Sequence, residues 1–154
     1  MIFATVGTQL PFPRLMDALN ALAAGTSEEF IAQTGEATAN RSALQEMKSL
    51  QPAEFSDLFH RARVVVSHAG IGSILSARKF GKPLIIVPRR HALDEHRNDH
   101  QMATARQVEG SPGIYVAWET DALADLLASD LAPASEAMSP AREHLITHIA
   151  KLLA

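Results

Sequence analysis

Short apolar runs and longer amphipathic stretches alternate along this chain. The apolar runs predict buried strands, with a weaker candidate at 46–50, and the polar stretch 35–42 is expected to be a loop. The expected strands lie at 2–6, 30–34, 46–50, 64–67, 84–88 and 113–118, and the expected helices at 13–24, 52–62, 72–80, 94–107, 120–128 and 140–153. Apolar strands between helices are typical of a parallel sheet covered on both faces. We therefore expect one doubly wound, Rossmann-like α/β domain over residues 1–154, with about six parallel strands.

Composition narrows the class of protein. A chain of 154 residues is long enough for one well-packed domain, and its formal charge of -3 gives no support for nucleic-acid binding. Because the chain has no cysteine, disulfides, thiolate metal sites and cysteine nucleophiles are excluded. The first residues resemble a strand and not a signal peptide, and no segment approaches the roughly 20 apolar residues of a membrane-spanning helix. We expect a cytoplasmic protein that reaches a membrane only through another protein.

Three strand-to-loop junctions carry the candidate chemistry. They are Gly7-Thr8-Gln9, the glycine-rich turn 68–73 (His-Ala-Gly-Ile-Gly-Ser), and the polar segment 89–101. A helix that begins in a glycine-rich turn offers bare N–H groups and the positive end of its dipole, which suits a phosphate or diphosphate. The polar segment offers side chains that can bind sugar hydroxyls. Together the junctions predict a nucleotide site at the carboxyl ends of the strands.

Each junction also has a purely structural explanation. The turn glycines could serve only helix–strand packing, His68 could be hydrogen-bonded to backbone, and the polar segment could be a solvated helix face. His96 and His100 have the spacing of zinc ligands on a helix, but no third ligand stands in a recognisable pattern. No metal and no cofactor is therefore expected.

A dinucleotide-binding domain is the competing enzyme class. Gly70 and Gly72 supply two of the three glycines of that motif, but Leu75 occupies the third position. The motif also requires an acidic residue about 20 positions further on, which binds the ribose. Arg89 and Arg90 occupy that place here, and they would suit only the 2′-phosphate of NADP.

Five segments in register resemble the donor-binding half of family 28 glycosyltransferases, the MurG-type enzymes of the two-domain GT-B fold. The resemblance runs over roughly residues 1–120 and is greatest toward split members, whose donor and acceptor domains are separate chains. These include the catalytic subunit of the dolichol-pathway N-acetylglucosaminyltransferase and bacterial exopolysaccharide or capsule subunits of the PssE kind. The segments are Val6-Gly7-Thr8-Gln9, Gln33-Thr34-Gly35, the turn 67–73, Gly81-Lys82-Pro83-Leu84 and Asn98-Asp99-His100-Gln101.

The resemblance implies a role for each segment. Gly7, Thr8 and Gln9 would line the diphosphate and sugar side of the cleft, and the Gln33-Thr34-Gly35 segment would border the nucleoside. The diphosphate would be bound by His68, Gly70, Gly72 and Ser73. The donor sugar would be bound by His100 and Gln101, with Asn98 and Asp99 nearby. Ser76 stands where the family often has a glutamate for the ribose.

The implied activity is inverting transfer of a sugar from a UDP-sugar to a polyprenyl-diphosphate-linked acceptor in exopolysaccharide biosynthesis. Such a transfer needs a base that deprotonates the acceptor, and in two-domain members the acceptor-side domain carries it. We therefore expect activity only with a membrane-associated partner subunit, which would hold this chain at the inner membrane face. The alternative is a nucleotide-sugar-binding module without transfer activity.

Overall fold

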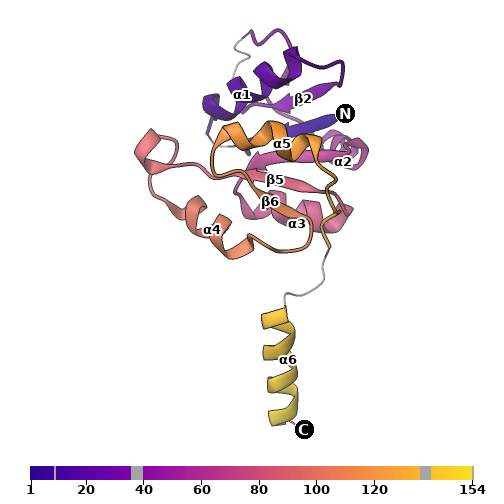
Figure 1. Cartoon of the computed structure of the whole chain (residues 1–154), viewed down its shortest axis with the longest axis vertical. Helices are drawn as coiled ribbons and strands as arrows, with labels where there is room; N and C mark the ends of the chain where they lie inside the picture. Colours follow the sequence, from indigo (N-terminus) through magenta and orange to yellow (C-terminus); the bar gives the residue numbers. More distant parts are fainter. Residues whose placement is uncertain (9, 36–39, 136–139, 154) are drawn as a thin grey trace.

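The computed structural model describes residues 1–8, 10–35, 40–135 and 140–153, and these form a parallel 6-stranded sheet with helices on both faces (Figure 1). The strand order is β3-β2-β1-β4-β5-β6. The strands are β1 (Ile2–Thr5), β2 (Phe30–Gln33), β3 (Gln45–Met47), β4 (Val64–His68), β5 (Leu84–Val87) and β6 (Ile114–Val116). This order confirms the doubly wound, Rossmann-like fold expected from the sequence.

The described residues form six α-helices, of which the first four connect successive strands and the first five pack on the sheet. They are α1 (Pro13–Ala24), α2 (Pro52–Arg61), α3 (Ile71–Phe80), α4 (His100–Val108), α5 (Leu123–Ala128) and α6 (Pro140–Leu153). Proline opens α1 and α2, where its missing N–H costs little, and α3 ends at Gly81, which is left-handed with φ of 64°.

Two hydrophobic layers lie on opposite faces of the sheet because neighbouring strand residues point to opposite sides. Ile2 and Ala4 pack with the apolar faces of α1 and α5 on one side. Phe3 packs on the other side, where α2, α3 and α4 contribute the buried residues. Its ring meets those of Phe55 and Phe59 on α2 edge-on, with centroids 5.6 and 6.1 Å away.

The sheet reverses its direction of growth between β1 and β4. From β1 the chain builds outward to β2 and β3, and then returns to place β4 on the other side of β1. In parallel sheets the loops that follow two such strands diverge and leave a crevice at their carboxyl ends. Gly7 follows β1 and the turn 68–73 follows β4, so two of the predicted junctions face each other across this crevice.

The helix expected over 94–107 is wrong in its first part, because α4 begins only at His100. Asp94 adopts a left-handed conformation, with φ of 56°, which a right-handed helix cannot contain. The side-chain oxygen of Asn98 accepts the N–H of His100 at 2.9 Å. Such short polar side chains compete with the helix for backbone N–H groups, so the segment is a loop.

The other differences are smaller. The strand expected at 113–118 shortens to β6, and the helix expected at 120–128 begins with a 3₁₀ turn, Thr120–Ala122, before α5. The loop expected at 35–42 lies partly, and Gln9 wholly, outside the described residues.

Helix α6 stands apart from the sheet and its covering helices (Figure 1). Its described side chains, at 147–153, are all exposed. None of the helices within the described ranges combines the length and the apolar character needed to cross a bilayer.

Candidate functional site

A cleft of about 690 Å³ opens at the carboxyl ends of β1 and β4. Seven of the predicted site residues line it: Gly7, Thr8, Gly35, His68, Gly70, Gly72 and Ser73. Asn98, His100 and Gln101 do not line it, although Gln101 lies directly behind it. The structure thus brings together two of the three predicted junctions and places the third beside them.

One wall of the cleft is the N-terminus of α3. Gly70 is its N-cap and has no side chain to cap the helix. Among the described hydrogen bonds, none uses the backbone N–H of Ile71, Gly72 or Ser73. A Cβ added at Gly72 would meet nothing within 4 Å, so the space beside this residue at the start of α3 is open. Uncapped N–H groups together with the helix dipole favour an anion at this point.

The His68 ring stands between the two glycine loops. A Cβ added at Gly70 would lie 2.4 Å from the Cε1 atom of His68, and one added at Gly7 would lie 2.9 Å from its Nε2 atom. Both positions must therefore lack a side chain for the ring to occupy this place. Gly70 has a steric role toward His68, whereas Gly72 leaves room for a ligand.

Gln101 holds the opposite edge of this ring. Its side chain is 7% exposed, and its Nε2 atom lies 2.9 Å from Nδ1 of His68. Its Oε1 atom accepts the backbone N–H groups of Ala69 and Arg89, each at 3.1 Å. Both ends of the amide already have protein partners. A direct contact with the donor sugar stays a prediction.

The imidazole of His68 is neutral at physiological pH. Burial lowers its pKa, and the charge of Arg89 and the proximity of His96 lower it further, to about 4. A neutral ring has a single N–H, so its interaction with an anion depends on which nitrogen carries the proton.

Gln33 organises the other side of the cleft. Its side chain is 5% exposed, and its amide donates to the carbonyls of Gly7 and Lys48 at 3.0 and 3.1 Å. Its Oε1 atom accepts the hydroxyl of Thr5 at 2.7 Å. This residue was expected to border the nucleoside. The structure shows in addition that it joins the loop after β1 to the loop after β3.

Lys48 was not anticipated as a site residue. It lies in the loop after β3, lines the cleft, and forms no ion pair among the described residues. No motif surrounds it in the sequence, and only the parallel pairing of β2 with β3 brings it to the cleft. Its ammonium adds a positive charge to a cleft in which no described lining residue is acidic.

Arg89 anchors the loop after β1 from behind the cleft. Its side chain is 2% exposed and donates to the carbonyls of Val6, Leu10 and Pro11 at 2.9, 2.6 and 2.6 Å. Its guanidinium also lies 4.7 Å from the centroid of the Phe12 ring. The Arg89 side chain therefore holds the loop after β1 in place. In the sequence, the only sign of this role was that Arg89 directly follows the end of an expected strand.

This arrangement weighs against the dinucleotide alternative. Arg89 is buried and committed to carbonyls, and Arg90 binds Glu119 at 2.8 Å and the carbonyl of Trp118. Neither arginine lines the cleft, so neither is placed to bind a 2′-phosphate.

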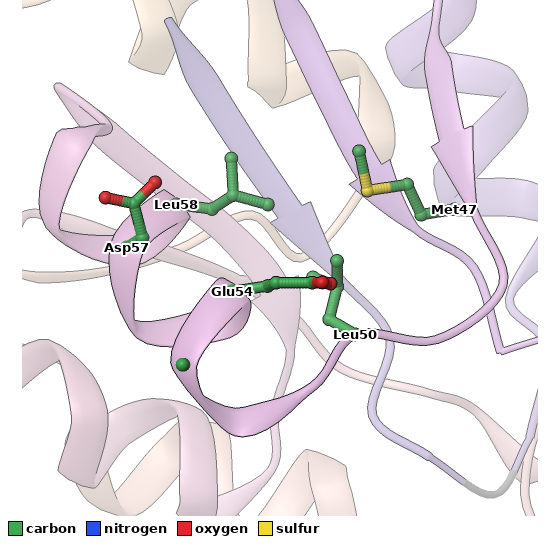
Figure 2. A pocket seen from close by; sticks show the side chains of 6 residues that line it. Met47, Leu50, Glu54, Asp57 and Leu58 are labelled. Atoms are coloured by element: carbon green, nitrogen blue, oxygen red, sulfur yellow. The ribbon is translucent and has the colours of Figure 1, made fainter.

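A second, smaller hollow of about 430 Å³ lies against α2 and shares Leu50 with the cleft. In Figure 2 the Leu58 side chain extends from α2 in the direction of Met47, and the Asp57 carboxylate extends away from Met47. The lining is apolar apart from Glu54 and Asp57. Two carboxylates repel an anion, so this hollow suits a phosphate group less well than the cleft does.

The remaining predicted residues lie outside the cleft. His100 and Asn98 are exposed. Ser76, in contrast, lines the cleft, and it stands at the position where the family that the sequence resembles often has a glutamate for the ribose. Within the described part of the chain, no group of three or more His, Cys, Asp or Glu residues could hold a metal ion.

Comparison with known proteins gives a family match over nearly the whole chain. A model of the glycosyltransferase family 28 C-terminal domain matches residues 1–151. A relative from Paramagnetospirillum magneticum (strain ATCC 700264 / AMB-1) is 32% identical over 79 residues, which are 51% of this chain and 20% of the relative. It is a UDP-N-acetylglucosamine–N-acetylmuramyl-(pentapeptide) pyrophosphoryl-undecaprenol N-acetylglucosamine transferase. The match thus spans about a fifth of that relative's length.

Solved structures share the fold. The solution structure of ALG13 has a TM-score of 0.60 at 21% identity, over 94% of this chain and 93% of that chain. The calicheamicin glycosyltransferase CalG4 has a TM-score of 0.61 at 17% identity, over 84% of this chain and 34% of that chain. MurG from Acinetobacter baumannii has a TM-score of 0.57 at 16% identity, over 81% of this chain and 39% of that chain.

Proposed function

The chain belongs to the family of glycosyltransferase family 28 C-terminal domains, and on that premise we propose that it is the donor-binding, catalytic subunit of a two-component inverting glycosyltransferase. The donor is a UDP-sugar, and the acceptor is a polyprenyl-diphosphate-linked sugar in exopolysaccharide biosynthesis. The relative from P. magneticum supports this chemistry, since its name specifies a UDP-sugar donor and a pyrophosphoryl-undecaprenol acceptor.

The observation that carries the proposal is the cleft between β1 and β4. It combines the uncapped N-terminus of α3, the His68 ring and the Lys48 ammonium, and no described residue that lines it is acidic. This combination fits a diphosphate, and a volume of about 690 Å³ is enough for a nucleoside diphosphate.

In sugar transfer the same groups act on the leaving group. Negative charge grows on the departing diphosphate as its bond to the sugar breaks, and fixed N–H donors stabilise that charge without having to reorganise. The N–H groups of α3 and the N–H of His68 are such donors. They take the part that a bound metal ion plays in other transferases, so the mechanism requires no metal.

A partner subunit supplies the missing half of the reaction. The acceptor hydroxyl must lose a proton, and among the described residues of the cleft the titratable side chains are only His68 and Lys48. With a pKa of about 4, His68 is too weak a base for this step. We place the base, the acceptor site and the membrane attachment in the partner, which holds this chain at the inner membrane face.

Calorimetric titration with UDP, UDP-sugars and NADP tests donor binding. UDP and at least one UDP-sugar bind, and NADP does not, because Leu75 replaces the third glycine of the dinucleotide motif and neither Arg89 nor Arg90 lines the cleft to bind a 2′-phosphate. Equal affinity for NADP, or no affinity for any nucleoside diphosphate, contradicts the proposal.

Transfer is tested by co-expression with the partner and a lipid-linked acceptor. Sugar is transferred only when both proteins are present. If the reconstituted pair binds the nucleotide sugar but transfers nothing, the chain is a non-catalytic binding module. If the purified chain transfers sugar alone, the base and the acceptor site do not lie in a partner subunit.

A further inference from the structure

We propose that Gln101 is a positioning residue that fixes His68 in one tautomer, so that the ring N–H points into the diphosphate cleft. The inference rests on the proposed function for the identity of the ligand. The tautomer itself follows from the geometry of the protein alone.

The orientation of the Gln101 amide is determined by its backbone neighbours. Two N–H groups, of Ala69 and Arg89, lie 3.1 Å from one atom of the amide. Because a backbone N–H can only donate, that atom is the oxygen. The NH₂ group is therefore the one that lies 2.9 Å from Nδ1 of His68.

The amide orientation determines the tautomer. An NH₂ group can only donate, so Nδ1 must present its lone pair and accept the hydrogen bond. The single proton of the neutral ring is then on Nε2. The charged and titratable neighbours, Arg89 at the end of β5 and His96 in the loop before α4, both disfavour a second proton on the ring.

The protonated nitrogen is the one at the cleft. Nε2 lies between the Gly7 and Gly70 loops, and no described hydrogen bond occupies it. Its N–H adds a neutral, directed donor to the N–H groups at the start of α3. In the other tautomer Nε2 would present a lone pair to the anion and repel it.

The substitution Gln101→Glu tests this assignment because it preserves the shape of the side chain. One carboxylate oxygen still accepts the N–H groups of Ala69 and Arg89. The other oxygen cannot donate to Nδ1 of His68, so it draws a proton onto that nitrogen. At high pH the ring becomes Nδ1–H, and at lower pH the carboxylate favours a doubly protonated ring.

Nitrogen-15 NMR of the imidazole and UDP titration from pH 5.5 to 8.5 give the readouts, with a His68→Gln spectrum to identify the signal. The natural protein shows the Nε2–H tautomer. Titration of His68 changes its UDP affinity little between pH 5.5 and 8.5. The Gln101→Glu variant shows Nδ1–H at pH 8.5 and binds UDP about tenfold more weakly there, the loss of one hydrogen bond to a charged group. Its affinity recovers toward pH 5.5.

Gln107→Glu is the matched control, because Gln107 is an exposed residue near the other end of α4. It adds the same charge to the same helix and leaves the tautomer and the pH profile unchanged. An Nδ1–H ring in the natural protein overturns the inference, and so does a Gln101→Glu affinity that is reduced equally at every pH with an unchanged tautomer. If no nucleoside diphosphate binds, the proposed function fails, while the NMR result still decides the tautomer.

Discussion

Gly70 and Gly72 are two positions apart in the same turn and have different surroundings. Gly70 leaves room for the His68 ring, and Gly72 borders open space at the start of α3. The absence of a side chain thus serves the protein's own packing at one position and the approach of a ligand at the other.

Substitution separates these two roles. Gly70→Ala lowers the free energy of unfolding by about 1–3 kcal/mol, because its Cβ overlaps the His68 ring. Gly72→Val folds with little change in stability and binds UDP at least about tenfold more weakly, because its side chain blocks the backbone N–H groups. Urea denaturation and calorimetry of both variants measure the effects. A Gly72→Val protein that unfolds would show that this glycine is structural as well.

The depressed pKa of His68 predicts how stability varies with pH. Burial, Arg89 and His96 lower this pKa to about 4 from its ordinary value of 6.5. Between these values the unfolded chain binds a proton that the folded chain does not, so stability rises with pH. The contribution is fully present above about pH 6.5 and is lost as pH falls toward 4, a change of about 3 kcal/mol.

The comparison with His68→Gln isolates this effect from the carboxylates that titrate in the same range. Urea unfolding of both proteins at several pH values gives the difference in their free energies of unfolding. That difference should shrink on acidification from pH 7 to pH 4. A constant difference would mean that His68 has no depressed pKa in the folded protein.

At the scale of elements, the loop after β1 depends on the end of β5. Arg89 donates to three carbonyls of that loop, and a lysine cannot reproduce this planar set of donors. Arg89→Lys therefore lowers the free energy of unfolding by about 2 kcal/mol or more and weakens UDP binding through the displaced loop.

Arg97→Lys is the control, since Arg97 is exposed and has no hydrogen bond or ion pair among the described interactions. It should leave stability and UDP affinity unchanged in the same urea and calorimetric measurements. Equal effects of the two substitutions would show that the hydrogen bonds of Arg89 contribute nothing specific.

The elements themselves were largely predictable from the hydrophobic pattern, since buried parallel strands are short apolar runs. The first part of the helix expected at 94–107 was not predictable, because periodicity reveals neither the left-handed conformation of Asp94 nor the hydrogen bond from the N–H of His100 to the side chain of Asn98. The glycine turn was also predictable, because a strand end, two glycines and a helix start are adjacent in sequence.

The support of the site could not be predicted in the same way. Gln101 meets His68 across a separation of 33 residues, and Gln33 meets Gly7 across 26. Such pairs depend on which strands become neighbours and on how far each strand extends. A single sequence contains the residues but not their distances.

At the scale of the whole molecule, the cleft combines the backbone dipoles of α3 with the neutral His68 ring and the Lys48 ammonium. The described residues include no group of three or more His, Cys, Asp or Glu placed to hold a metal ion. We therefore predict that EDTA leaves the calorimetric affinity for UDP unchanged. A clear loss that added divalent cations restore would implicate His96 and His100 as ligands, and substitution of either would then have the same effect.

The domain matches about a third of the CalG4 chain and 39% of the MurG chain, in agreement with its equivalence to one half of the GT-B fold.

The buried amides of Gln33 and Gln101 have a kinetic consequence. Each connects two loops around the cleft through hydrogen bonds among the protein's own groups. Because these hydrogen bonds hold the loops in place, ligand binding requires little further movement of the loops. It also costs little conformational entropy for ordering them. Association would then be a single encounter whose rate rises in proportion to nucleotide concentration, and differences in affinity among nucleotide sugars would lie in how long each remains bound.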